Sequence, residues 1–271
     1  MSTPFLVEYK GNCHCKAFKF IFKAPEIKQT FVCACSICYK NGYLWGFPSE
    51  GVVDVVKGGT ESTLKSYQFG NCTHKFCPTC GTSVLAHLAN GTIAINLRTL
   101  HEFDATALPE VARDNGANEP AYRVPEPLDV GPVPKGTIVY QGSCHCGAVR
   151  YAQLASEPLQ EAKECNCSIC HRDAALWVYP GTPTVIFAGL TSLTEYTFGL
   201  GRTYHGFCGS CGVSIRERFV NTKLEGFEGR DRTRKVALNV RTMSGVDLGE
   251  LTIKKHDGRL GSKAGPYDAG W

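Results

Sequence analysis

The segment Cys33-Ala34-Cys35-Ser36-Ile37-Cys38 occurs a second time in the same chain, as Cys165-Asn166-Cys167-Ser168-Ile169-Cys170. Working outward from these two segments, further motifs recur in the same order. They are Gly11-Asn12-Cys13-His14-Cys15 with Gly142-Ser143-Cys144-His145-Cys146, Phe76-Cys77-Pro78-Thr79-Cys80-Gly81 with Phe207-Cys208-Gly209-Ser210-Cys211-Gly212, and Asn96-Leu97-Arg98-Thr99 with Asn239-Val240-Arg241-Thr242. Self-similarity at a long, nearly fixed offset marks a repeated structural unit. The sequence therefore predicts a tandem duplication of one domain.

The limits of the two copies follow from where the repeats end and where proline accumulates. The stretch 104–136 is rich in proline and lacks amphipathic periodicity. Because proline removes a backbone donor and disfavours helix in the preceding residue, this stretch is expected to be an extended connector. We expect a first domain at 1–103, the connector at 104–136 and a second domain at 137–271. The second copy also carries an insertion at 217–235, and the chain ends in a tail at 258–271.

Within each copy, short segments rich in β-branched and aromatic residues alternate with turn residues, and the chain has 29 glycines. Such segments are typical of strands joined by turns. The expected strands are Ala17–Phe22, Val52–Val56, Thr92–Leu97, Val149–Tyr151, Thr184–Phe187 and Val236–Val240. The predicted fold class is mostly β, with little helix.

The composition excludes several classes of protein. Of 271 residues, 43% are hydrophobic and 20% charged, which is typical of folded domains rather than disordered chains. Fifteen cysteines cannot all pair within one chain, and a chain this long can bury a core without disulfides. The first ten residues lack the pattern of a secretory signal, and no run of 18 apolar residues occurs. We expect a reduced, cytoplasmic protein with no membrane segment, whose thiols bind metal.

The net charge of +4 is too small to indicate a nucleic-acid partner. The densest basic run, Arg230 to Lys235, is interrupted by Asp231 and follows two glutamates. It is expected to be a solvated loop rather than a phosphate-binding patch.

Each copy contains seven cysteines in a fixed order, and Cys72 is left unmatched. A structural zinc takes four ligands in a closed tetrahedron, whereas a catalytic zinc has three protein ligands and an open position. Seven cysteines can therefore supply one site of each kind. Spacing alone does not decide which cysteines group together, because the compact C-x-C-x-x-C could also recruit a fourth cysteine from elsewhere.

The motifs Gly-x-Cys-x-Cys-Gly, Cys-x-Cys-Ser-x-Cys and Phe-Cys-x-x-Cys-Gly, in this order, resemble the glutathione-dependent formaldehyde-activating family, which includes the centromere protein V domain. The resemblance implies that each copy is a β-tent domain that binds about two zinc ions. It implies structural zinc on Cys13, Cys15, Cys77 and Cys80, and on Cys144, Cys146, Cys208 and Cys211. It implies the catalytic zinc on Cys33, Cys35 and Cys38, and on Cys165, Cys167 and Cys170.

The chain departs from the family pattern at a few positions. Lys16 stands where the family and the second copy (Gly147) have glycine, and Val213 stands where the family and the first copy (Thr82) have threonine. The duplication itself is a further departure. No metal ligand is lost, but these changes leave open whether both copies are active or whether one has become a scaffold.

The chemistry expected of a three-thiolate zinc is thiol activation. Three thiolates leave a site of formal charge −1, which acidifies water weakly and favours a soft fourth ligand such as a substrate thiol. The resemblance implies addition of glutathione to formaldehyde, a carbon–sulfur lyase reaction run in reverse, with a small thiol and an aldehyde as partners. Two alternatives are a related enzyme acting on another metabolite and a non-catalytic, zinc-stabilised module that binds protein or chromatin.

Four further residues are candidates for the substrate site. Arg98 and Arg241 could bind a glutathione carboxylate, although a structural role is the simpler interpretation. Trp45 and Trp177 could line the pocket beside the open zinc or belong to the core. Cys72 could be an extra ligand or an inert buried thiol.

Overall fold

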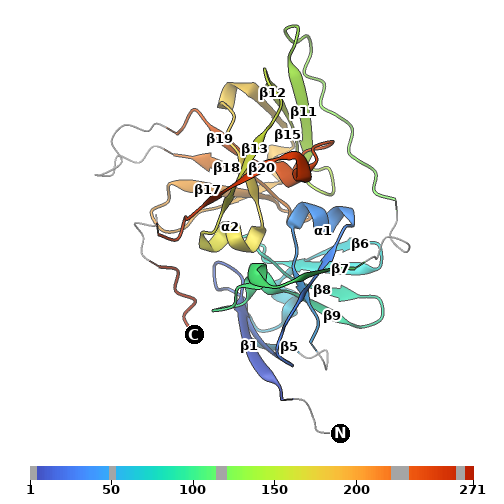
Figure 1. Ribbon diagram of the computed structural model, residues 1–271, viewed down its shortest axis with the longest axis vertical. Helices are drawn as coiled ribbons and strands as arrows, with labels where there is room; N and C mark the ends of the chain where they lie inside the picture. Colours follow the sequence, from blue (N-terminus) through green and yellow to red (C-terminus); the bar gives the residue numbers. More distant parts are fainter. Residues whose placement is uncertain (1–4, 49–52, 114–120, 221–231, 261–265) are drawn as a thin grey trace. The chain divides into compact units, whose positions relative to one another are not determined.

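The computed structural model describes residues 5–48, 53–113, 121–220, 232–260 and 266–271 (Figure 1). The chain divides into two compact units. Unit one comprises residues 1–122, 171–174 and 267–271, and unit two comprises 123–170 and 175–266. In these described ranges the regular structure is almost entirely strand and short 3-10 turns, with two six-residue α-helices, Ser36–Asn41 (α1) and Ser168–Asp173 (α2). The predicted mostly-β, duplicated fold is confirmed.

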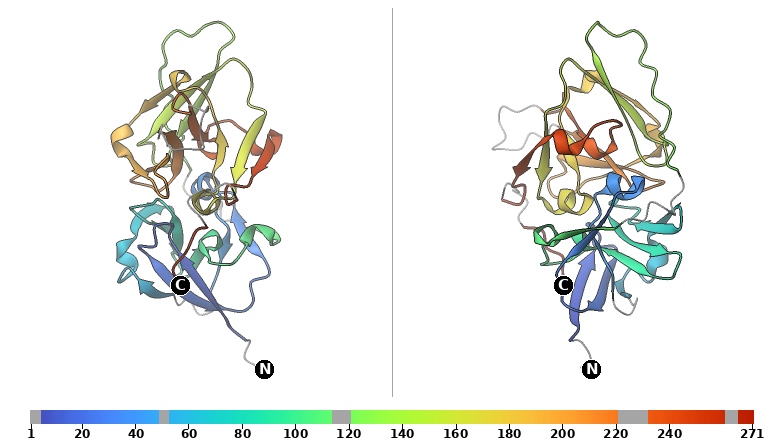
Figure 2. Two further views of the ribbon diagram at one scale, coloured as in Figure 1. Left: turned by 90° about the vertical axis from the view of Figure 1, so that its left-hand side faces the viewer. Right: turned by 45° about the vertical axis from the view of Figure 1, so that its right-hand side comes forward.

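The described residues of unit one form a three-stranded and a seven-stranded sheet. The smaller has the order β1-β2-β5, and the larger has the order β10-β3-β4-β9-β8-β7-β6. Figure 2 draws the strands of this unit in blue to green. The strands are β1 (Val7–Asn12), β2 (Lys19–Ala24), β3 (Thr30–Cys33), β4 (Trp45–Gly46), β5 (Val53–Lys57), β6 (Lys65–Phe69), β7 (Cys72–Phe76), β8 (Ser83–Leu88), β9 (Ile93–Asn96) and β10 (Glu110–Arg113).

Unit two repeats this arrangement, with the orders β11-β12-β15 and β16-β17-β18-β19-β14-β13-β20. The strands are β11 (Ile138–Ser143), β12 (Arg150–Ala155), β13 (Glu161–Cys165), β14 (Leu176–Val178), β15 (Val185–Ala188), β16 (Leu193–Tyr196), β17 (Thr203–Cys208), β18 (Ser214–Phe219), β19 (Val236–Asn239) and β20 (Thr252–His256). In each unit the last strand runs parallel to the strand before the C-x-C-x-x-C segment, as β13 and β20 show in Figure 1.

The six expected strands all form, with ends shifted by a few residues. Val52 lies outside the described residues, as does 221–231 within the predicted insertion. The predicted start of that insertion at residue 217 is wrong, because residues 217–219 complete β18 and pair with β17 as the end of β8 pairs with β7. The stretch expected to be an extended connector contains a strand, β10, which pairs with β3 in the sheet of unit one. The boundaries predicted at 103 and 137 stay predictions.

The asparagine of the repeated Asn-x-Arg-Thr segment caps a 3-10 turn and hydrogen-bonds to a neighbouring strand. The Asn96 side chain accepts a hydrogen bond from the backbone N–H of Arg98 and caps a 3-10 turn, while its Nδ2 donates to the Ser83 carbonyl at 2.9 Å. Asn239 makes the same bonds with Arg241 and with Ser214. Because short polar side chains satisfy the unpaired N–H groups at such turns, this motif needs no substrate to explain it.

Glycine in the Gly-x-Cys motif is explained by a close approach between strands. A Cβ atom at Gly11 would collide with the ring of Phe20, and one at Gly142 would collide with the ring of Tyr151. Both rings are fully buried, so neither can move away without opening the core.

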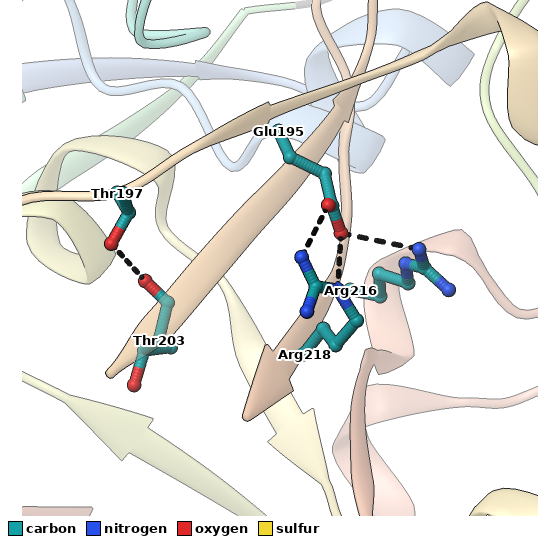
Figure 3. Close-up of polar contacts among 5 residues, drawn as sticks. All are labelled: Glu195, Thr197, Thr203, Arg216 and Arg218. Atoms are coloured by element: carbon teal, nitrogen blue, oxygen red, sulfur yellow. Dashed lines mark hydrogen bonds and ion pairs between the residues drawn. The ribbon is translucent and has the colours of Figure 1, made fainter. Parts of the chain in front are cut away.

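An ion-pair network fixes one face of β18 (Figure 3). Glu195 on β16 accepts hydrogen bonds from Arg218 at 2.7 and 3.0 Å and from Arg216 at 3.2 Å. Since successive side chains of a strand point to opposite faces, Glu217 between these arginines points to the other face.

Candidate metal centres

Four cysteines of each copy come together from two turns that are far apart in sequence. The Sγ atoms of Cys13, Cys15, Cys77 and Cys80 lie within 4.8 Å of one another, and so do those of Cys144, Cys146, Cys208 and Cys211. Neighbouring sulfurs are 3.6 to 3.7 Å apart. A tetrahedral zinc with Zn–S bonds of about 2.3 Å requires sulfur–sulfur distances of about 3.8 Å. Both clusters therefore fit a closed, four-thiolate zinc.

Backbone donors and a tight turn support these clusters. The N–H of Phe18 donates to Cys13 Sγ, and the N–H of Val149 donates to Cys144 Sγ, both at 3.3 Å. The residue after each C-x-C is left-handed, with φ of 62° at Lys16 and 77° at Gly147. Glycine adopts this conformation without strain, whereas lysine does not. This explains the glycine of the family pattern and makes Lys16 a strained position.

The C-x-C-x-x-C segments form three-thiolate clusters. In each, the first cysteine ends a strand, the second directly precedes the following short helix and the third lies in that helix, and all three Sγ atoms lie within 4.8 Å of one another. The indole N–H of Trp45 donates to Cys38 Sγ at 3.4 Å, and that of Trp177 donates to Cys170 Sγ at 3.3 Å. Hydrogen bonds from the neighbouring thiols lower the pKa of Cys33 and of Cys165. Three clustered thiolates with these donors fit a zinc ion.

The cluster of the first copy lines a pocket with mostly apolar walls. The pocket is lined by Cys33, Cys35, Cys38, Trp45, Phe47, Cys72, His74, Ala86, Leu88, Ala94 and Arg113. The Arg113 guanidinium stacks over the Phe47 ring, 4.3 Å from its centroid. Burial lowers the pKa of His74 to about 4, so this imidazole is neutral near pH 7.

The cluster of the second copy has a buried carboxyl group beside it. Glu217 Oε1 lies 3.4 Å from Cys170 Sγ and 3.4 Å from His205 Nδ1. Glu217 is only 6% exposed, and burial raises its pKa to about 7. Burial also lowers the pKa of His205 to about 4, which makes it a poor cationic partner for the carboxylate.

The sequence model of the family described as "Glutathione-dependent formaldehyde-activating enzyme" matches residues 8–113 and 139–227. This chain belongs to that family. A crystal structure of a Rhodobacter sphaeroides protein is 28% identical in sequence, with 42% of this chain and 99% of that chain covered and a TM-score of 0.35. The two matched segments confirm the tandem arrangement of two family domains.

The structure places the other predicted site residues as follows. The two tryptophans contact the third thiol of each loop, and Trp45 also lines the pocket of the first copy. Arg98 is buried and donates from Nε to the Gly42 carbonyl at 3.0 Å, a contact that suits a structural role. Arg241 is half-buried. The roles of these four residues in substrate binding stay predictions.

Cys72 lies in the wall of the first copy's pocket but outside every group of close metal-ligating atoms found in the described residues.

A second pocket, in unit two, is lined by Gln153, Leu159, Glu161, Ala162, Lys163, Trp177, Val178, Tyr179, Pro180 and Lys254 and contains no cysteine. In the described part of the chain, no helix is long and apolar enough to cross a membrane.

Sequence reasoning missed Arg113 and Glu217. Neither belongs to a repeated motif, since Arg113 corresponds to His256 and Glu217 corresponds to Ala86 by strand register. A residue-by-residue alignment of the two copies beyond the cysteine motifs would have revealed both differences.

Proposed function

We propose that the chain is a zinc-dependent carbon–sulfur lyase that activates a thiol, such as glutathione, for addition to or release from a small aldehyde. The single observation that carries this proposal is the pocket of the first copy, into which a cluster of three thiols opens without a fourth protein ligand among the described residues. Family membership supports the same reaction class.

Cys33, Cys35 and Cys38 would hold the zinc. When bound, zinc takes a soft fourth ligand readily, so it would bind the substrate thiol and favour its deprotonated form. The Trp45 N–H neutralises part of the negative charge on Cys38 and fixes the orientation of that ligand. The apolar side chains of Phe47 and Leu88 exclude water beside the thiols, which protects a thiol–aldehyde adduct from side reactions.

Substrate orientation would come from Arg113. It is a cation in a pocket wall, and its guanidinium lies over the Phe47 ring, so it is positioned to pair with a substrate carboxylate. In the addition, the thiol sulfur bonds to the aldehyde carbon, and the carbonyl oxygen gains the proton that the thiol lost. Release breaks the same carbon–sulfur bond. Holding both reactants together supplies the proximity that this step requires.

A non-catalytic binding module is the main alternative, and a lyase acting on another metabolite is a second one. A purely structural site has no need of a pocket beside incompletely liganded thiols, and this observation favours an enzyme. We further propose that the protein acts in the reducing environment of the cytoplasm, where these thiols stay available for metal.

The test combines metal analysis with a glutathione titration of the purified, reduced protein. We expect about four zinc ions per chain, and we expect added glutathione to increase the sulfur coordination seen in the zinc X-ray absorption spectrum. A zinc content near two, or a spectrum that glutathione does not change, would overturn the proposal. Arg113→Ala should weaken glutathione binding more than the binding of a thiol without a carboxylate.

A further inference from the structure

The two copies differ at one strand position that faces the three-thiolate cluster. In unit one, His74 pairs with Ala86 across β7 and β8, and in unit two His205 pairs with Glu217 across β17 and β18. Ala86 lines the pocket of the first copy. A carboxyl group therefore stands in the second copy where the first copy has only a methyl group.

The carboxyl group lies at ligand distance from one of the three thiols. With a Zn–S bond of about 2.3 Å and a Zn–O bond of about 2.0 Å, a tetrahedral zinc separates its sulfur and oxygen ligands by about 3.5 Å. Glu217 Oε1 is 3.4 Å from Cys170 Sγ. It forms a close group with Cys170 and His205 rather than with all three thiols, so its side chain must turn toward Cys165 and Cys167 to complete the tetrahedron. In its charged form this carboxylate would be stabilised by a nearby positive charge, because burial of an uncompensated carboxylate is costly. Lys163 and Arg232 act on it through longer-range charge interactions, and a cation at the cluster would neutralise it directly.

Two further features close the second copy's cluster. A Cβ atom at Gly258 would lie 2.5 Å from Cys165 Sγ and 2.9 Å from the Cys167 Cβ, so the backbone after β20 runs directly across these thiols. Hydrogen bonds from Arg259 to Asn166, at 2.8 and 3.2 Å, hold that backbone in place.

Side-chain size adds to this closure. Phe219 in the second copy corresponds to Leu88 in the pocket wall of the first copy, and Phe219 packs in a buried cluster with Cys170. The wall position that Leu88 occupies in unit one thus carries a larger, buried side chain in unit two.

We propose that Glu217 is the fourth ligand of the zinc held by Cys165, Cys167 and Cys170, and that this site is closed to substrate. The second copy then carries two closed metal sites, and thiol activation belongs to the first copy alone. The inference rests on the proposed function only in requiring zinc on the three-cysteine loops.

The experiment uses the full-length protein loaded with cadmium-113 and followed by NMR. The shift of this nucleus reports the ligands of each ion separately. We expect four resonances, two from four-thiolate sites and two from three-thiolate sites. Cys35→Ser should displace or remove one of the latter pair and so assign the first copy.

Glu217→Gln keeps the size of the side chain but removes the charged ligand, and Glu217→Ala installs the residue of the first copy. Both should shift the unassigned three-thiolate resonance and leave the other three in place. If neither variant moves that resonance while all four sites are filled, Glu217 is not a ligand and the inference is wrong. A shift of the wild-type second-copy resonance on addition of glutathione would also overturn it, since that site would be open.

The reciprocal variant is Ala86→Glu, with Ala86→Gln as its matched control of similar size. Ala86→Glu should abolish the response of the first copy's resonance to glutathione, whereas Ala86→Gln should retain a response. Equal loss in both variants would mean that side-chain size, not ligation, blocks the site. If glutathione shifts no resonance of the wild-type protein, the proposed function is contradicted. The spectra of the Glu217 variants without glutathione would still decide whether Glu217 is a zinc ligand.

Discussion

The three-thiolate loops of the two copies have the same ligands and the same tryptophan contact but different surroundings. Trp45 and Trp177 donate to equivalent sulfurs at nearly equal distances. The walls differ, since Ala86 and Leu88 in one copy correspond to Glu217 and Phe219 in the other. The comparison teaches that a ligand motif specifies where a metal binds, while neighbouring strands decide what else can reach it.

The largest expected effect comes from removing a ligand of a four-thiolate site. Cys211→Ser should unfold the second copy, and Cys80→Ser should unfold the first. The apparent binding free energy of structural zinc, about 10–16 kcal/mol, is comparable to the whole stability of a domain, about 5–15 kcal/mol. Circular dichroism and limited proteolysis would measure the loss. A variant that keeps its full β signal and resists proteolysis would contradict a structural role for that site.

Replacing one cysteine ligand in each three-thiolate loop tests whether only the first copy is catalytically active. Cys35→Ser should lower turnover by more than about 100-fold, beyond the loss typical of a group that only supports a ligand. Cys167→Ser should leave turnover close to wild type while lowering the melting temperature of the second copy. Steady-state kinetics with glutathione and an aldehyde would measure both. Equal losses of turnover would show that both copies are active.

The turn after each C-x-C provides a smaller, reciprocal test. Lys16→Gly should stabilise the first copy by about 0.5–1 kcal/mol, because the left-handed conformation strains lysine. Gly147→Lys should destabilise the second copy by about 1–3 kcal/mol. The left-handed backbone would be strained, and the new Cβ atom would lie only 3.0 Å from the Pro125 side chain. Urea unfolding would measure both changes, and destabilisation by Lys16→Gly would refute the strain at this turn.

The smallest expected effect comes from the ion pairs of Glu195 with Arg216 and Arg218, on the face of β18 opposite Glu217. Hydrogen bonding from Arg218 holds the pKa of Glu195 below its ordinary value of 4.5. The resulting stability is fully present above the unfolded-state pKa and is lost as the pH falls through the lower folded-state pKa. Glu195→Gln should therefore cost about 0.2–1 kcal/mol at pH 7, because the pair is partly exposed, and less under acid conditions. Thermal unfolding across pH would measure this cost, and an effect independent of pH would exclude the ion pair as its source.

Much of the fold could be predicted because its signals are local. The cysteine spacings indicated two copies and two kinds of metal cluster, and short apolar segments indicated strands. The strand β10 was not foreseen, since pairing with β3 depends on residues about 80 positions away. The Asn-x-Arg-Thr repeat was visible, but only the structure showed that Asn96 and Asn239 use it to cap a turn.

By itself, the sequence determined the duplication, the mostly-β class and the set of cysteines available to each metal, because all three are recorded in motifs and their spacing. Tertiary structure alone decided that Ala86 and Glu217 face these thiols. These residues reach the clusters through strand pairing with residues that are distant in sequence. The alternation of side chains along a strand predicts which face of the sheet a residue occupies, but it does not predict which residue of the next strand lies beside it. The proposed difference in substrate access between the copies rests on that pairing.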